Sequence, residues 1–207
     1  MRVPIRTCSG DHGPPREPIW IESNDSKEAA RALEFLHAQI AVAAIDPYAW
    51  KWVIAALDHS LHTFLVAGLA GTKAAARLEP GAPGSALRFE SRAPDEGADG
   101  AESGLGALYA RMKLLSGFQP PEEVDQDVAR LIQYHHVLFR RLPARWILQV
   151  DAMPRMTRNC LSVVEYLGWN PGRISWPAPN LTDLARVKYL ASMKMLEALD
   201  SQHRSAA

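Results

Sequence analysis

Cysteine is scarce in this chain, and neither sign of charge is in excess. The two cysteines, Cys8 and Cys160, lie in a polar N-terminal stretch and in a predicted helix. They form neither a metal cluster nor a disulfide framework, which fits a reducing cytosol. The 23 basic and 23 acidic side chains balance, so no overall field draws the chain to nucleic acid or to an anionic membrane. Any such binding must come from a local patch.

Long apolar runs are absent as well. The N-terminal stretch MRVPIRTCSGDHGPPREP lacks the apolar core of a signal peptide. The longest apolar run, residues 64–70, is too short to cross a bilayer. We therefore expect a cytoplasmic protein with no membrane partner.

The 207 residues, of which 47% are hydrophobic and 22% charged, are typical of one globular domain with flexible attachments. Residues 1–23 hold four prolines and two glycines and are expected to form a disordered tail. A helical domain is expected over 24–176. It is interrupted at about 72–104 by a Gly-, Pro- and Ala-rich insertion. Residues 177–207 are expected to form a C-terminal helix and tail.

Apolar residues recur at helical spacing in six segments, and capping or helix-breaking residues bound each of them. An extended connector is expected at 146–150. We find no internal repeat and no pair of strands, so the predicted fold class is all-α: an antiparallel helical bundle with one long insertion. The expected helices are 26–44, one from Asp46-Pro47 to near Gly71, one from Leu105 stopped by Gly117, 121–141, one through Met156 ending at Gly168, and one capped by Asn180 and Thr182.

The most informative segment is LIQYHHVLFRRLPARW, residues 131–146, which places two histidines and an arginine close together. An imidazole exchanges a proton near neutral pH, and a guanidinium remains cationic and binds phosphate. His136 and Arg140 are four residues apart and share a helix face, whereas His135 is rotated aside by roughly 100°. These residue types suit contact with a phosphate group.

This segment resembles the signature of the HEPN proteins, in particular a bacterial and plasmid-borne subfamily of small helical proteins. Their consensus reads roughly L-N-x-L-R-N-x-F-I-H-F-x-P-x-x-W. Two further blocks resemble the same subfamily in the same order: WKWVIAAL, continuing through FLV to GT at 50–72, and YLGWNPG at 166–172. The residues that carry the resemblance outside these blocks are Leu131, Leu138, Phe139, Pro143, Trp146 and Trp176.

The chain departs from the family where the chemistry lies. HEPN ribonucleases carry R-N-x-x-x-H, in which the arginine and the histidine act on the RNA phosphate. Here His135 holds the arginine position, His136 the asparagine position and Arg140 the histidine position. The resemblance also implies a homodimer in which the motif helices meet, so that a site can draw on both chains.

Three functions follow. The first is a HEPN-like protein degenerate at its motif, a binding module for RNA, a nucleotide or a protein partner in a bacterial defence or toxin–antitoxin-like setting. The second is an active metal-independent endoribonuclease that uses His135 and His136 for proton transfer and Arg140 for the phosphate. The third is a structural protein with no ligand. None of them requires a cofactor.

Other polar residues have more than one interpretation. Arg141 and Arg145 either extend a phosphate site or form a solvated, carboxylate-paired cluster. Asp58 and His62 are four residues apart, which suits an orienting hydrogen bond or two metal ligands. No further ligand is visible, so we expect no metal. His62 can instead face the motif helix.

Four tryptophans lie beside apolar runs in the family-like blocks: Trp50, Trp146, Trp169 and Trp176. They lack the interleaved basic residues of an RNA-stacking platform, so we expect them in the core.

Overall fold

The computed structural model describes residues 23–70, 104–140, 145–170 and 174–206. Within these ranges all regular structure is helical, which confirms the all-α class. The insertion and the N-terminal tail lie outside the described residues. The elements are α1 (Asp25–Ala43), a 3-10 turn (Pro47–Ala49), α2 (Trp50–Ala70), α3 (Leu105–Ser116), α4 (Glu122–His135), a π-helical turn (His136–Arg140), α5 (Met153–Trp169) and α6 (Pro179–Ala206).

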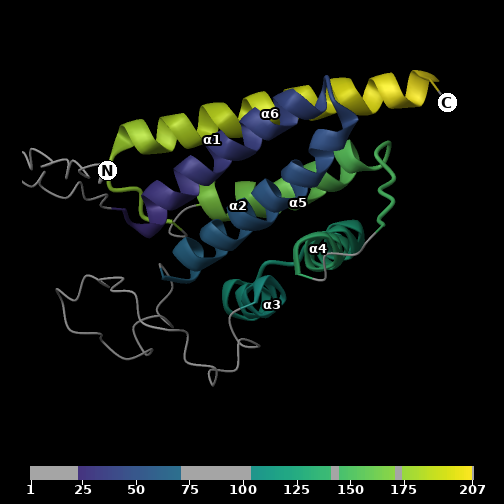
Figure 1. Ribbon diagram of the computed structural model, residues 1–207. Helices are drawn as coiled ribbons and strands as arrows, with labels where there is room; N and C mark the ends of the chain where they lie inside the picture. The colour runs from purple at the N-terminus through teal and green to yellow at the C-terminus, as the bar shows by residue number, and fades with distance from the viewer. Residues whose placement is uncertain (1–22, 71–103, 141–144, 171–173, 207) are drawn as a thin grey trace, which may run out of the picture.

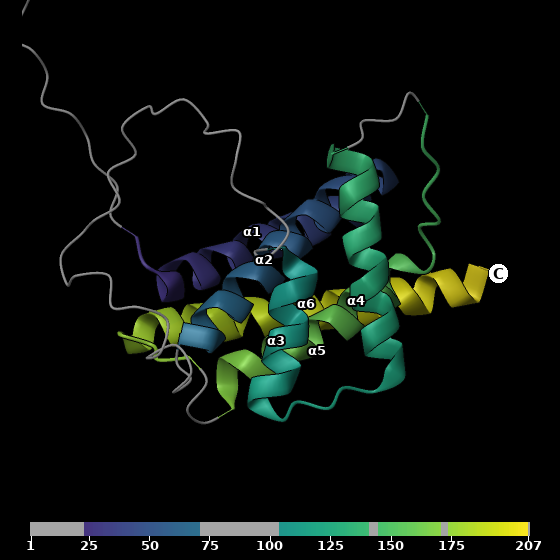
Figure 2. The same cartoon turned by 90° about the horizontal axis from the view of Figure 1, so that it is seen from below.

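The helices form three layers. α1 and α6 lie side by side on one face, α2 and α5 form the middle layer, and α3 and α4 cover the other face (Figures 1 and 2). α1 and α2 run antiparallel, as do α5 and α6, whereas α3 and α4 cross the long helices steeply. The bundle is therefore only partly antiparallel, because α3 and α4 lie across the other four helices.

α2 lies at the centre of the molecule. It packs against α1, α3, α4 and α5, and its side chains Phe64, Leu61 and Ile54 are fully buried. By length and composition alone, Pro47–Leu69 meets the requirement for a membrane span, a possibility that the short run 64–70 did not indicate. Most of this helix is buried among its neighbours, and that burial accounts for its apolar composition.

Several predicted helix ends are confirmed by their caps. The Asn24 side chain accepts a hydrogen bond from the Lys27 amide at 2.9 Å, and Asp46 accepts one from Tyr48 at 2.9 Å. Gly117 ends α3 in the left-handed conformation, with φ 66°.

The expected caps of the last helix are wrong: α6 begins at Pro179, so Asn180 and Thr182 lie inside it. Proline tolerates a first-turn position because it needs no amide hydrogen there.

Two glycines allow the middle layer to pack closely. A Cβ at Gly168 would lie 2.9 Å from the Phe64 ring, and one at Gly68 would lie 3.0 Å from Leu167. The distance at Gly168 is too short for a carbon contact, and the one at Gly68 would require Leu167 to move, so the close approach of α2 and α5 is favoured by the missing side chains.

Candidate functional site

The motif residues line a groove of about 370 Å³ at the junction of three helices. α2 contributes Asp58 and His62, and the N-terminus of α3 contributes residues 104–106. The end of α4 and the π turn contribute Ile132, His135, His136 and Arg140. The groove therefore brings together residues that are up to 82 positions apart in the sequence, from Asp58 to Arg140.

Three of the predicted site residues, His135, His136 and Arg140, line this one groove together with His62. The interpretation that His62 faces the motif helix is thereby confirmed. Arg145 is exposed in the connector after α4 and does not line the groove. Arg141 lies outside the described residues.

The expected orientation of His135 is wrong. An unbroken α-helix would rotate His135 away from the face of His136 and Arg140, yet His135 also lines the groove. The α-helical part of the motif helix ends at His135, and the next five residues form a π turn. A π turn is wider than an α turn because its hydrogen bonds span five residues. It changes the angular spacing of the side chains that follow, so the α-helical relation of His135 to Arg140 does not apply here. Such turns recur at functional sites.

His135 lies next to a carboxylate. Its Nδ1 is 3.7 Å from Asp58 Oδ1, a distance at which charges attract but no direct hydrogen bond forms. The other side of the ring packs against Phe139, with the ring centroids 5.2 Å apart. The imidazole is thus held between a carboxylate and an aromatic ring, an arrangement that orients it toward the groove.

Asp58 carries the main electrostatic perturbation in the site. Burial raises the pKa of its carboxyl group, and the nearby His135, His62, His59 and Arg140 oppose that shift. A carboxyl whose pKa is raised next to histidines is typical of proton-transfer sites. His59 itself is exposed and does not line the groove.

The N-terminus of α3 adds a second source of positive potential. Gly104 occupies the cap position, and in the described part of the chain no side-chain hydrogen bond caps this helix. Uncapped amides and the helix dipole both favour an anion. Gly106, in the first turn, has no side chain that could cover them.

A cluster of exposed aromatic rings adjoins the groove. Tyr48 and Trp52 are 61% and 48% exposed, and the Trp52 ring lies 5.9 Å from Phe139. The Lys51 ammonium lies 5.4 Å from the centroids of Trp52 and Phe139 and 5.9 Å from that of Trp146. A basic residue is therefore interleaved with these rings, contrary to the sequence interpretation. The string WKW contained this signal, because Lys51 stands between Trp50 and Trp52.

The four tryptophans expected in the core divide into two groups. Trp50 is 2% exposed and belongs to the core, whereas the other three are partly buried against it. Trp169 and Trp176 pack on Phe64, and Trp146 packs on Tyr48 near the groove.

Within the described ranges, no group of three or more histidine, cysteine or acidic side chains has an arrangement that suits a metal ion. Cys160 is a free thiol in the core, where burial raises its pKa strongly.

Asp58→Asn is expected to raise the melting temperature at neutral pH. Because burial raises the pKa of Asp58, the folded state holds this proton more tightly than the unfolded state does. The stabilising contribution of the protonated carboxyl is complete at low pH and is lost as the pH rises through the folded-state pKa. Melting curves of both proteins between about pH 4 and pH 8 should diverge toward the alkaline end.

Asp183→Asn is the matched control, since Asp183 is exposed on α6. Its melting curves should follow those of the unsubstituted protein at every pH. If Asp58→Asn lowers the melting temperature at the alkaline end, Asp58 is a net stabilising partner of His135 instead.

No protein-family model, no curated protein and no solved structure matches the chain. The function of the groove is therefore inferred from the residues that line it.

Proposed function

We propose that the groove binds single-stranded RNA through a phosphate, and that the chain is a HEPN-like binding module degenerate at the family's catalytic motif. The observation that carries this proposal is the convergence of His62, His135, His136 and Arg140 on one groove. The HEPN-like assignment rests on the sequence resemblance alone.

The groove offers more donors than acceptors. Arg140 is permanently cationic and can bind a phosphate through two parallel hydrogen bonds. Three histidines and the N-terminus of α3 add donors or positive potential. Asp58 is the one carboxylate lining the described part of the groove, and burial disfavours its ionised form. The balance therefore favours an anion.

The adjoining rings favour a single strand over a duplex. The chain of ring contacts runs from His135 through Phe139 to Trp52. Unpaired bases stack on exposed aromatic side chains, and a nearby lysine neutralises the backbone. A duplex keeps its bases stacked on one another, so its bases are not available to stack on such rings. An RNA strand can place a phosphate in the groove and a neighbouring base on Trp52.

Metal-independent cleavage of RNA is the second candidate. The 3.7 Å approach of Asp58 to His135 is the observation that favours it, because a carboxylate beside a histidine orients a general base. Binding is preferred because the histidine and arginine positions of the family motif are exchanged. A catalytic proton transfer depends on placement to fractions of an ångström.

The resemblance also implies a homodimer and a role in bacterial defence, with RNA, a nucleotide or a protein as partner; the cytoplasmic location is expected from the composition. These remain part of the proposal. The groove as described draws its lining residues from one chain, so the RNA proposal does not depend on the dimer.

Binding is tested by fluorescence anisotropy with a labelled single-stranded RNA of mixed sequence, in the presence of chelator. Arg140→Ala should weaken binding about 10-fold, the scale of losing one charge-assisted phosphate contact. It should also reduce the slope of log affinity against log salt concentration by about one, because one phosphate contact is lost. Arg186→Ala removes the same charge from the exposed side of α6 and should leave binding unchanged.

The same samples, run on a denaturing gel, separate binding from cleavage. We expect intact RNA. Cleavage that falls by about 100-fold or more in His135→Ala or His136→Ala would establish the second candidate. An RNA affinity equal in the unsubstituted protein and in Arg140→Ala would overturn the proposal.

A further inference from the structure

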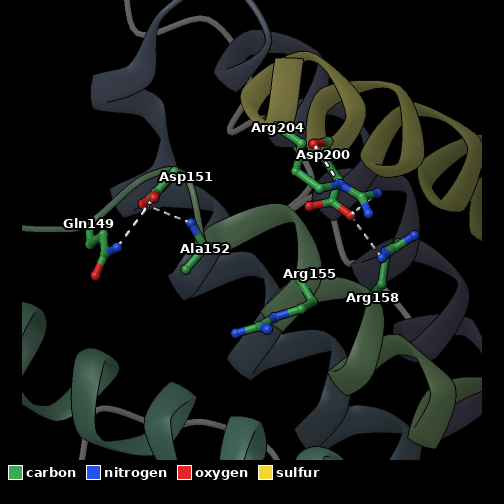
Figure 3. A pocket seen from close by; sticks show the side chains of 7 residues that line it. All are labelled: Gln149, Asp151, Ala152, Arg155, Arg158, Asp200 and Arg204. Atoms are coloured by element: carbon green, nitrogen blue, oxygen red, sulfur yellow. Dashed lines mark hydrogen bonds and ion pairs between the residues drawn. The ribbon is translucent and has the colours of Figure 1, made fainter. Parts of the chain in front are cut away.

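A second cavity, of about 400 Å³, lies at the opposite ends of α5 and α6 from the tryptophan cluster around Phe64. Its wall contains three arginines: Arg155 and Arg158 from the first turns of α5, and Arg204 from the last turns of α6 (Figure 3). The connector before α5 closes one side with Gln149 and Asp151. The sequence did not indicate this cluster, because Arg204 is 46 residues beyond Arg158.

Two of the arginines share one carboxylate. Arg158 Nη2 and Arg204 Nη2 each lie 3.0 Å from Asp200 Oδ2. The Asp200 side chain is only 12% exposed, whereas that of Arg204 is 71% exposed. The carboxylate of Asp200 therefore lies beneath two guanidinium groups, and the three side chains together present a net positive charge to the cavity. Each guanidinium retains donors, since a guanidinium has five N–H groups.

Arg155 supplies a further cation. Its side chain extends away from Asp200 (Figure 3) and also lines a smaller cavity of about 140 Å³ next to Glu123 and Asp127 of α4. In the described part of the chain, no ion pair or hydrogen bond holds its guanidinium. The Nε of Arg158 is buried and likewise has no hydrogen-bond partner among the described residues. A buried donor without a partner is unfavourable and is satisfied by water or by a ligand.

Asp151 is the second carboxylate in the cavity wall, and it is already engaged. Its Oδ1 accepts a hydrogen bond from the Ala152 amide at 3.0 Å, and its Oδ2 accepts one from Gln149 Nε2 at 3.2 Å (Figure 3). It therefore stabilises the start of α5 and does not neutralise Arg155. Three arginines against two aspartates leave a net charge of +1 around the cavity.

We propose that this cavity binds a small phosphorylated anion carrying two or more charges, such as a pyrophosphate or a sugar phosphate. Arginines in this number favour bidentate phosphate contacts, and the volume lies in the range of small-molecule sites. Among the described residues, the lining contains no aromatic side chain on which a nucleobase would stack. The phosphate group is therefore the recognised part of the ligand.

Isothermal titration of the full chain with pyrophosphate, in low salt with chelator, tests the proposal. Arg155 has no structural partner among the described residues, so Arg155→Ala should fold normally and should bind at least about 10-fold more weakly, as expected for one lost charge-assisted contact. Arg111→Ala removes an exposed arginine of α3 and is the control that should bind like the unsubstituted protein. The side-chain Nε–H signal of Arg158 should shift on titration.

Single-stranded RNA with a 5′-phosphate or a 5′-hydroxyl distinguishes a free small molecule from the end of a strand. Binding of pyrophosphate that depends on Arg155 but not on Arg140 supports the proposal. If Arg155→Ala weakens the binding of 5′-phosphorylated RNA but not that of 5′-hydroxyl RNA, the cavity binds the phosphate at the end of a strand. Absence of pyrophosphate binding, or equal binding by Arg155→Ala, would overturn the proposal and leave the RNA groove unaffected.

Discussion

Replacing Phe64 by alanine is expected to lower the free energy of unfolding by about 3–5 kcal/mol, the usual cost of removing a buried aromatic ring. Phe64 is fully buried at the contact of α2 with α5. Its ring lies 6.3 Å from that of Trp169 and 6.1 Å from that of Trp176, and it fills the space left open by Gly168. Rigid neighbours of this size cannot collapse into the resulting cavity. Urea denaturation followed by circular dichroism measures the loss.

Phe35→Ala is the matched control for this prediction. Phe35 lies on α1 and is 49% exposed, so its removal should cost less than about 1 kcal/mol. Equal losses for the two variants would mean that the Phe64 side of the core repacks, and the arrangement of α2 on α5 would need revision.

Asp127→Ala is expected to lower the free energy of unfolding by about 2–3 kcal/mol, the scale for leaving buried polar groups unpaired. The Asp127 side chain is 5% exposed and lies 2.5 Å from Arg130 Nη1. Its other oxygen accepts a hydrogen bond from Asn159 Nδ2 of α5 at 2.7 Å. Removing the carboxylate leaves the Asn159 amide without this partner and breaks a polar link between α4 and α5. Because α4 carries the motif groove, RNA binding should weaken in parallel.

Asp127→Asn separates the hydrogen bonds from the charge. Its amide oxygen can still accept from Asn159, so this variant should lose less than Asp127→Ala does. If the two variants are equally destabilised, the charge of Asp127 matters and the link to Asn159 does not.

Most helices could be predicted from the sequence because their ends are local features. Asn24 and Asp46 cap through side chains that reach amides two or three residues away, and Gly117 ends α3 by adopting a conformation that glycine tolerates. The start of α6 was misplaced because Asn180 and Thr182 are good capping residues wherever they stand. A capping preference does not exclude a start at the preceding Pro179.

The candidate site could be predicted only in part. The residue types of His135, His136 and Arg140 indicated phosphate chemistry, but α-helical geometry placed His135 on the wrong side. The π turn that follows His135 has no signature that we can identify in the sequence. The approach of Asp58 to His135 also depends on how α4 lies across α2, which is a matter of packing.

The sequence by itself thus determined the helical class, most helix ends and the presence of proton-transferring and cationic side chains, because these follow from local periodicity and side-chain chemistry. The tertiary structure alone decided which of them meet. It brought Asp58 and His62 to the motif, exposed Trp52 beside Lys51, and assembled Arg155, Arg158 and Arg204 around Asp200. These neighbours come from different helices, and their contacts depend on the burial of apolar faces that lie elsewhere in the chain.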